Sequence, residues 1–227
     1  MTRVTECQVR MDLELLDLVD LDYRPHPAAG PLRRRVALES ANLKQDTQVI
    51  VRYHYLHRGR TMAQLPYWIL LDGKRVGGLL FSLPRMSASF CGYGPMTVLE
   101  LARMWVSPSV QGIRLTDSSG ETHVFSVASC AVGNALRKCR QDWTAKYPNL
   151  PKPMAVVSWA DLEHHEGVIY RAANFRDAGK SGGSLHGSTL RRNGGHDQLH
   201  ADYQHEKRAF LYEYRRPTKQ HPSTAQE

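Results

Sequence analysis

Two apolar segments joined by a tight turn constrain the fold of this chain most strongly. Residues 67–72 (YWILLD) and 75–83 (RVGGLLFSL) flank the turn Asp72-Gly73-Lys74. Asp-Gly between two apolar runs is typical of a two-residue β-hairpin, because such turns need positive φ angles that Gly adopts freely. The sequence therefore predicts an antiparallel pair of strands near the middle of the chain.

Four further segments have the pattern of strands. Residues 98–106 (VLELARMWV), 155–160 (AVVSWA) and 207–214 are rich in apolar, β-branched or aromatic side chains, and Asp161 closes the second of them. Residues 11–23 (MDLELLDLVDLDY) begin with leucines that alternate with acids, which indicates a strand with one polar face.

Three segments are predicted to be helical. Residues 40–56 place apolar side chains at helical spacing, and a short helix is expected over Gly167 to Asn174. Ser118 and Glu121 match a capping box, in which each side chain satisfies a free amide at the start of a helix. The long helix that follows is expected to run to about Tyr147, because apolar side chains recur there every three or four positions.

Strands and helices together indicate a mixed α/β domain around one central sheet. The chain has 227 residues, which suits a single domain. Residues 1–216 are assigned to that domain and residues 217–227 to a tail that is expected to be disordered. Residues 177–200, which are rich in Gly, Ser and His, are expected to form a loop.

The charge balance favours a polyanionic partner. Lys and Arg number 30 against 22 Asp and Glu, giving a formal net charge of +8, and nucleic acid is the natural candidate. No segment has the roughly 18 consecutive apolar residues of a membrane span, so no membrane partner is expected. The four cysteines form no CxxC pair, and the chain start lacks a signal-peptide pattern, so a cytoplasmic location is expected. P-loop, GxGxxG and HExxH motifs are absent, which argues against NTPases, Rossmann dehydrogenases and common zinc enzymes.

Three residues have side chains that suit acid–base chemistry, and each also has a structural alternative. Asp161 follows an apolar strand, where α/β proteins place their ligands, or it caps the next helix. Tyr170 could donate a proton to a leaving group such as a thiolate, or it could be a core aromatic residue. His54 could be a base or a structural hydrogen-bonding residue.

Glu100 and Arg103 are charged residues inside one predicted strand. Their separation of three positions predicts that they lie on opposite faces, so only one of them points inward. A buried charge needs a partner, and Asp161 or an anionic ligand would serve for Arg103. The basic run that contains Arg33 and Arg34 either contacts phosphates or forms a solvated face.

Four separate segments resemble motifs of the phage Mom proteins, over about residues 45–215. They are His54-Tyr55-Leu56-His57-Arg58, the strand from Glu100 to Val106, Ser158-Trp159-Ala160-Asp161, and the segment from Gly167 to Phe175 followed by Gly179. Parts of these segments are also similar to DruA-type anti-phage proteins. The Glu-Leu-Ala-Arg strand and the chain length favour Mom.

The resemblance implies an enzyme that converts adenine in DNA to its N6-carbamoylmethyl derivative, which protects phage DNA from host restriction. It also implies a fold similar to that of the GNAT acyltransferases. The family's functional positions carry over to His54, Tyr55, Arg103, Asp161 and Tyr170. The chain departs from the usual pattern after Asp161, and it lacks the GNAT pyrophosphate loop, which puts ordinary coenzyme A binding in doubt.

The resemblance further implies double-stranded DNA and a small-molecule group donor as partners. An activated donor is required, a coenzyme A thioester is one candidate, and iron or another metal ion is a candidate cofactor. A homodimer is one candidate oligomeric state. The candidate metal ligands are His54, Asp161 and His165. The candidate substrate contacts are Arg33, Arg34, Arg58, Glu100, Asn174 and Lys180.

Two alternative functions stay open at this point. One is a GNAT-type N-acetyltransferase that uses acetyl-CoA on a small molecule or a protein. The other is a non-catalytic DNA-binding or anti-phage module, which needs the basic charge but neither Asp161 nor Tyr170.

Overall fold

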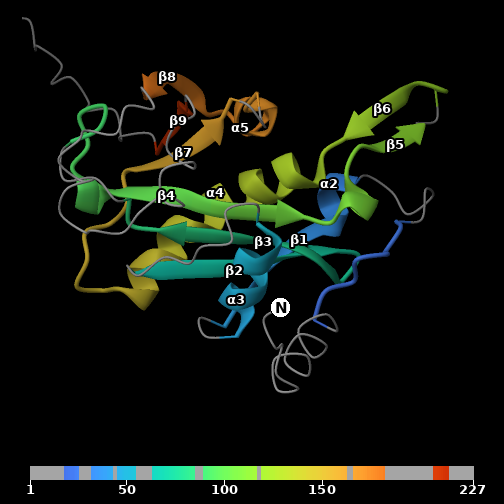
Figure 1. The fold of residues 1–227 in the computed structure, drawn as a ribbon, viewed down its shortest axis with the longest axis horizontal. Coiled ribbons are helices and arrows are strands. Elements are labelled where there is room, and N and C mark those ends of the chain that lie inside the picture. The colour runs from blue at the N-terminus through green and yellow to red at the C-terminus, as the bar shows by residue number, and fades with distance from the viewer. Residues whose placement is uncertain are drawn as a thin grey trace, which may run out of the picture.

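A seven-stranded sheet forms the centre of the computed structural model (Figure 1). The structure describes residues 18–25, 32–42, 45–54, 63–84, 89–116, 119–162, 166–181 and 207–214. The strands lie in the order β1 (Val36–Ser40), β2 (Gln64–Leu71), β3 (Lys74–Ser82), β4 (Val98–Val106), β7 (Ala155–Asp161), β9 (Lys207–Glu213) and β8 (Arg176–Ser181). Every pair is antiparallel except β4 and β7, which are parallel. This confirms the predicted α/β class with a mixed, mostly antiparallel sheet.

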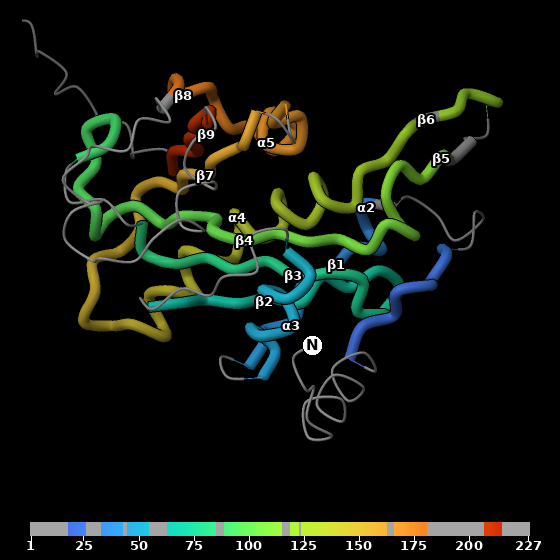
Figure 2. Tube along the Cα trace, viewed as in Figure 1, coloured from blue at the N-terminus to red at the C-terminus, as the bar shows by residue number. Residues whose placement is uncertain are grey.

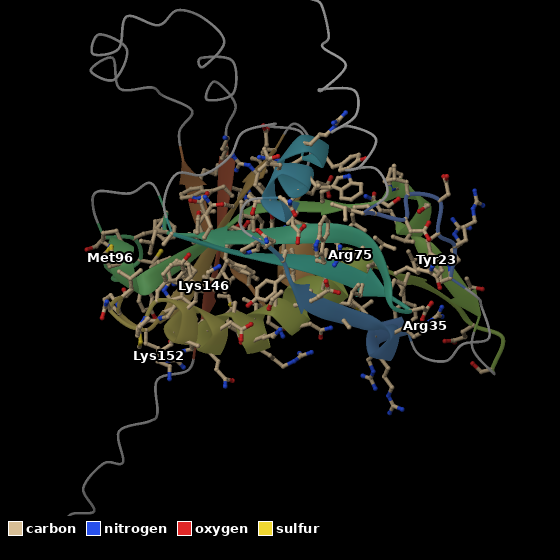
Figure 3. All side chains as sticks on the ribbon, turned by 90° about the horizontal axis from the view of Figure 1, so that it is seen from below. Tyr23, Arg35, Arg75, Met96, Lys146 and Lys152 are labelled. Carbon is tan, nitrogen blue, oxygen red and sulfur yellow. The ribbon has the colours of Figure 1, made fainter. Side chains whose placement is uncertain are left out.

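Helices cover both faces of this sheet. They are α2 (Leu32–Arg35), α3 (Asp46–Tyr53), α4 (Val127–Lys146) and α5 (Val168–Ala172), with short 3-10 turns η1 (Pro95–Thr97) and η2 (Pro108–Val110). The blue-green α3 lies on one side of the sheet, and the olive α4 lies on the other with the blue α2 (Figure 3). No helix in the described part of the chain is long and apolar enough to cross a bilayer.

The long helix α4 packs on the sheet through the apolar residues that the sequence predicted. Val132, Ala135, Leu136, Cys139 and Trp143 recur every three or four positions and are all buried in the main core cluster. The helix ends at Lys146, just before Pro148, as expected. Its apolar stripe therefore fixes α4 against one face of the sheet.

The predicted hairpin is confirmed. Leu71 and Lys74 face each other across a two-residue turn, in which Asp72 has φ 53° and Gly73 has φ 79°. Positive φ at both central residues is the geometry that matches the twist of an antiparallel pair. Arg35 and Tyr23 both donate to the Asp72 carboxylate, which stabilises this end of the sheet (Figure 3).

The predicted start of α4 is wrong. Helix α4 begins at Val127, and the Ser126 hydroxyl accepts the cap hydrogen bond from the Ser129 amide. The segment after Glu121 instead forms β6 (Thr122–Phe125), which pairs with β5 (Ile113–Thr116). This separate hairpin projects from the body of the protein (Figure 2). Thr, Val and Phe favour strands, and that preference outweighs the match to a capping box.

Other boundaries also differ from the prediction. Residues 18–23 form turns rather than part of a strand, and residues 11–17 lie outside the described residues. The helix expected over residues 40–56 spans only Asp46–Tyr53, and the strand β1 that precedes it was missed. Residues 177–181, expected in a loop, belong to strand β8, because their partner β9 supplies the hydrogen bonds that a local pattern cannot show. Residues 182–200 and 217–227 lie outside the described residues.

Candidate active site

A β-bulge in β4 puts Glu100 and Arg103 on the same face of the sheet. Leu80 of β3 pairs with Arg103, and the residue after Leu80 pairs with Leu101. Ala102 is therefore the extra residue of the bulge, and it shifts the alternation of side chains by one position. The prediction that Glu100 and Arg103 lie on opposite faces is wrong, because it assumed unbroken alternation.

Both charged side chains are buried. Glu100 and Arg103 are each 7% exposed. The Arg103 guanidinium donates to the Ala102 carbonyl of the bulge, so this irregularity of the strand also holds the side chain. Buried ionisable side chains cluster at functional sites, which makes this pair a candidate for binding or catalysis.

The face that carries Arg103 is the one that α3 covers, and we name it the α3 face. It bears Trp68, Leu80 and Trp105, which pack with residues of α3. The opposite face, named the α4 face, bears Leu79, Phe81 and Leu101 in the main core cluster.

Helix α3 crosses the sheet from β2 towards β4. Asp46 at its start accepts a hydrogen bond from Trp68 Nε1 at 2.9 Å, and Tyr53 at its end stacks on Trp105 at 4.4 Å. Between these contacts, Ile50 packs so closely on Gly78 that a Cβ there would lie 2.4 Å from Ile50 Cγ1. His54 follows directly and is 8% exposed. The helix therefore delivers His54 to the α3 face beside β4.

Strands β4 and β7 separate next to these residues. Their parallel pairing covers only three positions and ends at Glu100 and Val157, after which the strands diverge (Figure 1). Alternation along β7 places Val157 and Asp161 on the same face as Glu100, while Ala160 packs in the core of the α4 face. Asp161 is 4% exposed. Glu100, Arg103 and Asp161 thus share the α3 face, and α3 ends at His54 on the same side of the sheet.

Tyr170 approaches the same divergence from the α4 face. Its ring lies 5.2 Å from Phe210 and 5.6 Å from Phe175, within the main core cluster. Burial raises the pKa of Tyr170, and a hydrogen bond with Ser158 partly lowers it again. The Ser158 hydroxyl also donates to the Leu101 carbonyl at 3.1 Å, across the gap between β7 and β4.

Ser158 was part of a quoted motif, but its contacts were not predicted. No pattern in the sequence pairs a strand residue with a tyrosine twelve positions later, because that contact depends on how α5 (Val168–Ala172) folds back. The structure therefore adds Ser158, whose hydroxyl contacts both Tyr170 and the backbone of β4 where β4 and β7 separate.

The remaining predicted residues lie elsewhere or outside the described part. Arg33 and Arg34 are exposed on α2, which contacts α4, so they lie on the side of the sheet opposite to the α3 face. Asn174 is exposed and has a left-handed φ of 64°, and Lys180 is exposed on β8. The predicted residues Tyr55, Arg58 and His165 lie outside the described residues.

The metal prediction rests partly on a residue that is not described. Among the described residues, no three His, Cys, Asp or Glu side chains gather as a metal site would require. His54 and Asp161 share the α3 face, and His165 belongs to the undescribed segment after β7. The described residues alone therefore do not make up a ligand set for a metal ion.

Comparison with known proteins identifies a family. The model of the Mom protein family matches residues 35–222. No curated protein gives a significant match.

Solved structures similar to this chain include several acetyltransferases. An acetyltransferase of Salmonella typhimurium that modifies the N-terminal serine of ribosomal protein L7/L12 has a TM-score of 0.36 and 10% identity, over 67% of this chain and 64% of that chain. A Bacillus subtilis acetyltransferase in complex with CoA has a TM-score of 0.45 and 10% identity, over 79% of this chain and 99% of that chain. An IAA acetyltransferase from Bacillus cereus has a TM-score of 0.44 and 11% identity, over 79% of this chain and 99% of that chain. The chain thus spans 64% of the length of the first of these proteins.

Proposed function

Because this chain belongs to the Mom protein family, we propose that it is a modifying transferase that places a carbamoylmethyl group on N6 of adenine in duplex DNA. The observation that carries the proposal is the set of buried polar residues on the α3 face. His54, Glu100, Arg103 and Asp161 are each at most 8% exposed, and buried ionisable groups cluster at functional sites. The family resemblance assigns function to three of these four positions.

The substrate adenine would have to leave the duplex stack. Its N6 atom lies inside the helix, and enzymes that act on such atoms flip the base into a pocket. The net charge of +8 would hold the phosphate backbone without reading sequence, so that DNA binding weakens as salt rises.

Asp161 would act on the amine of the flipped base. The N6 lone pair is delocalised into the ring, so the amine is a poor nucleophile and gains from a carboxylate that orients it and accepts its proton. The N6–carbon bond forms as one N6 hydrogen is lost, and the bond from the donor carbon to its leaving group breaks. His54 lies on the same face and would share the transfer of this proton.

Arg103 would bind the anionic part of the donor or the negative charge that develops during transfer. A buried guanidinium suits this task because its five N–H groups are donors and it stays charged. The hydrogen bond from Arg103 to the Ala102 carbonyl fixes it before the substrate arrives.

Tyr170 would supply a proton to the leaving group from the α4 face. Burial raises its pKa, so the hydroxyl carries a proton at neutral pH that it can donate to the leaving group. Ser158 contacts both Tyr170 and the β4 backbone, and so positions the hydroxyl at the divergence. The acceptor and the leaving group would thus approach from opposite faces of the sheet.

Co-expression with a plasmid tests the proposal. Plasmid DNA from cells that make the protein is digested to nucleosides, and mass spectrometry should find adenosine enlarged by one acetamido group. Unmodified nucleosides from cells that contain folded protein would refute the proposal. An acetylated small molecule or protein in place of modified adenine would favour the acetyltransferase alternative instead.

The role of Tyr170 is tested in the same assay with a matched tyrosine. Tyr170→Phe should lose most of the modification, because the proton donor is gone. Tyr212→Phe removes a hydroxyl from a partly buried tyrosine that packs on Phe175, and it should modify DNA normally. Equal activity in the two variants would remove the acid role from Tyr170.

A further inference from the structure

Ser82 is a buried polar residue that the proposed mechanism does not use. It lies at the end of β3, its side chain is 0% exposed, and its Oγ has no hydrogen-bond partner among the described residues. Buried hydroxyl groups in folded proteins nearly always have a partner, because an unmet one loses its hydrogen bonds to water without replacement. An unmet hydroxyl beside a candidate active site indicates that a bound molecule supplies the partner.

The register of the sheet places Ser82 within the polar set. Ser82 pairs with Glu100 directly across β3 and β4, and residues in such pairs have Cβ atoms about 4.5–5.5 Å apart on one face. Ser82 also shares this face with Leu80, whose partner is Arg103. Ser82 therefore neighbours Glu100 and lies one row from Arg103 on the α3 face.

On this face, the Ser82 hydroxyl supplies a donor and the Glu100 carboxylate supplies an acceptor. That pair matches a planar group in which an amino group lies beside a hydrogen-bond acceptor. Adenine has this pattern where its N6 amine neighbours N1 or N7, and the carboxamide of the transferred group has it as well. Guanine and thymine have a carbonyl oxygen in place of that amine, so it would face the carboxylate as a second acceptor.

We propose that Ser82 is a substrate-binding residue whose hydroxyl, with the carboxylate of Glu100, holds an amino group and its neighbouring acceptor at the site. The proposal rests on the proposed function and adds to it a subsite with a defined hydrogen-bonding pattern. The pattern admits two sources, the edge of adenine and the amide of the donor, and these can be separated by experiment.

The first experiment compares Ser82→Ala with Thr47→Val. Thr47 lies on α3, is 8% exposed, and also has a buried hydroxyl without a partner among the described residues, so it is the matched control. Both variants should melt at or above the wild-type temperature, because each removes an unmet polar group. After induction beside a plasmid, modified adenosine should accumulate about tenfold more slowly in Ser82→Ala, the effect of one lost hydrogen bond. Thr47→Val should modify DNA at the wild-type rate.

Equal rates in Ser82→Ala and the wild type would overturn the proposal. A lower melting temperature in Ser82→Ala alone would also overturn it, because the hydroxyl would then have a structural role. If the wild type modifies no adenine, the proposed function fails. If the wild type modifies adenine and Ser82→Ala does so equally fast, only the role of Ser82 is refuted.

The second experiment identifies the group that Ser82 contacts. Purified wild type and Ser82→Ala are titrated with duplexes that carry adenine or unsubstituted purine opposite an abasic site, where flipping is easiest. If Ser82 holds the base, the wild type prefers adenine and Ser82→Ala loses that preference about tenfold. If Ser82 holds the donor amide, both proteins show the same preference while the modification rate of Ser82→Ala stays low.

Discussion

Gly167 should be among the least replaceable residues of this protein, because two independent effects act on it. It is the N-cap of α5 and has a φ of 73°, a left-handed conformation that other residues adopt only with strain. A Cβ at this position would lie 2.2 Å from Phe210 Cζ and 2.4 Å from Cε2. Phe210 is 0% exposed and packs against Tyr170, so its ring has little room to move.

A matched glycine separates the free-energy cost of backbone strain from the cost of the clash with Phe210. Gly112 has a φ of 63° but nothing within 4 Å of a built Cβ, so Gly112→Ala adds backbone strain alone, about 1–2 kcal/mol. Gly167→Ala adds the same strain and an overpacked core, about 1–3 kcal/mol more. With a shift of about 2–4 °C per kcal/mol for a chain of this size, the melting temperature should fall about 10 °C in Gly167→Ala and about 4 °C in Gly112→Ala.

Thermal melts and urea titrations of both variants measure these losses. Gly167→Ala should also reduce DNA modification at temperatures where it is fully folded, because α5 carries Tyr170. The packing account would be refuted if Gly167→Ala lost no more stability than Gly112→Ala.

Three further outcomes follow from the cysteines and from Ser158. In the folded protein, iodoacetamide should label the exposed Cys91 and spare the buried Cys139 until urea unfolds the chain, as peptide mass mapping would show. Burial raises the pKa of Cys139 to about 12 from 9.0, so its contribution to stability is complete below about pH 9 and is lost as pH rises towards 12. Urea titrations across that pH range should show a smaller loss of unfolding free energy in Cys139→Ala than in the wild type. Identical losses would contradict the raised pKa of Cys139. Ser158→Ala should destabilise the fold by about 1–3 kcal/mol, because the Leu101 carbonyl loses its donor, and should raise the pKa of Tyr170 further. Unchanged stability and unchanged modification in Ser158→Ala would argue against its role beside Tyr170.

Local signals in the sequence predicted the elements whose structure depends on neighbouring residues. The Asp72-Gly73 turn and the apolar stripe of α4 needed no knowledge of distant partners, and both are confirmed. The Ser118–Glu121 capping box failed because several local patterns competed, and Ser126 formed the cap instead.

The arrangement of the site depends on contacts that are distant in sequence. The bulge at Ala102 reverses the expected relation between Glu100 and Arg103, and no residue type in β4 signals it. Asp161 shares their face because β7 joins β4 in parallel, and the order of strands in a sheet is not visible in one sequence. The residue types of the site could therefore be predicted, but their common face could not.

The central claim is that the buried carboxylate of Asp161 takes part in modifying adenine, and one comparison tests it most directly. Asp161→Asn keeps the size of the side chain and removes its charge, and Glu166→Gln makes the same change at an exposed position five residues later. Each variant is expressed beside a plasmid, and the digested DNA is analysed by nucleoside mass spectrometry. We predict acetamido-modified adenosine from the wild type and Glu166→Gln, and none from folded Asp161→Asn. Wild-type levels of modified adenosine from folded Asp161→Asn would contradict the claim.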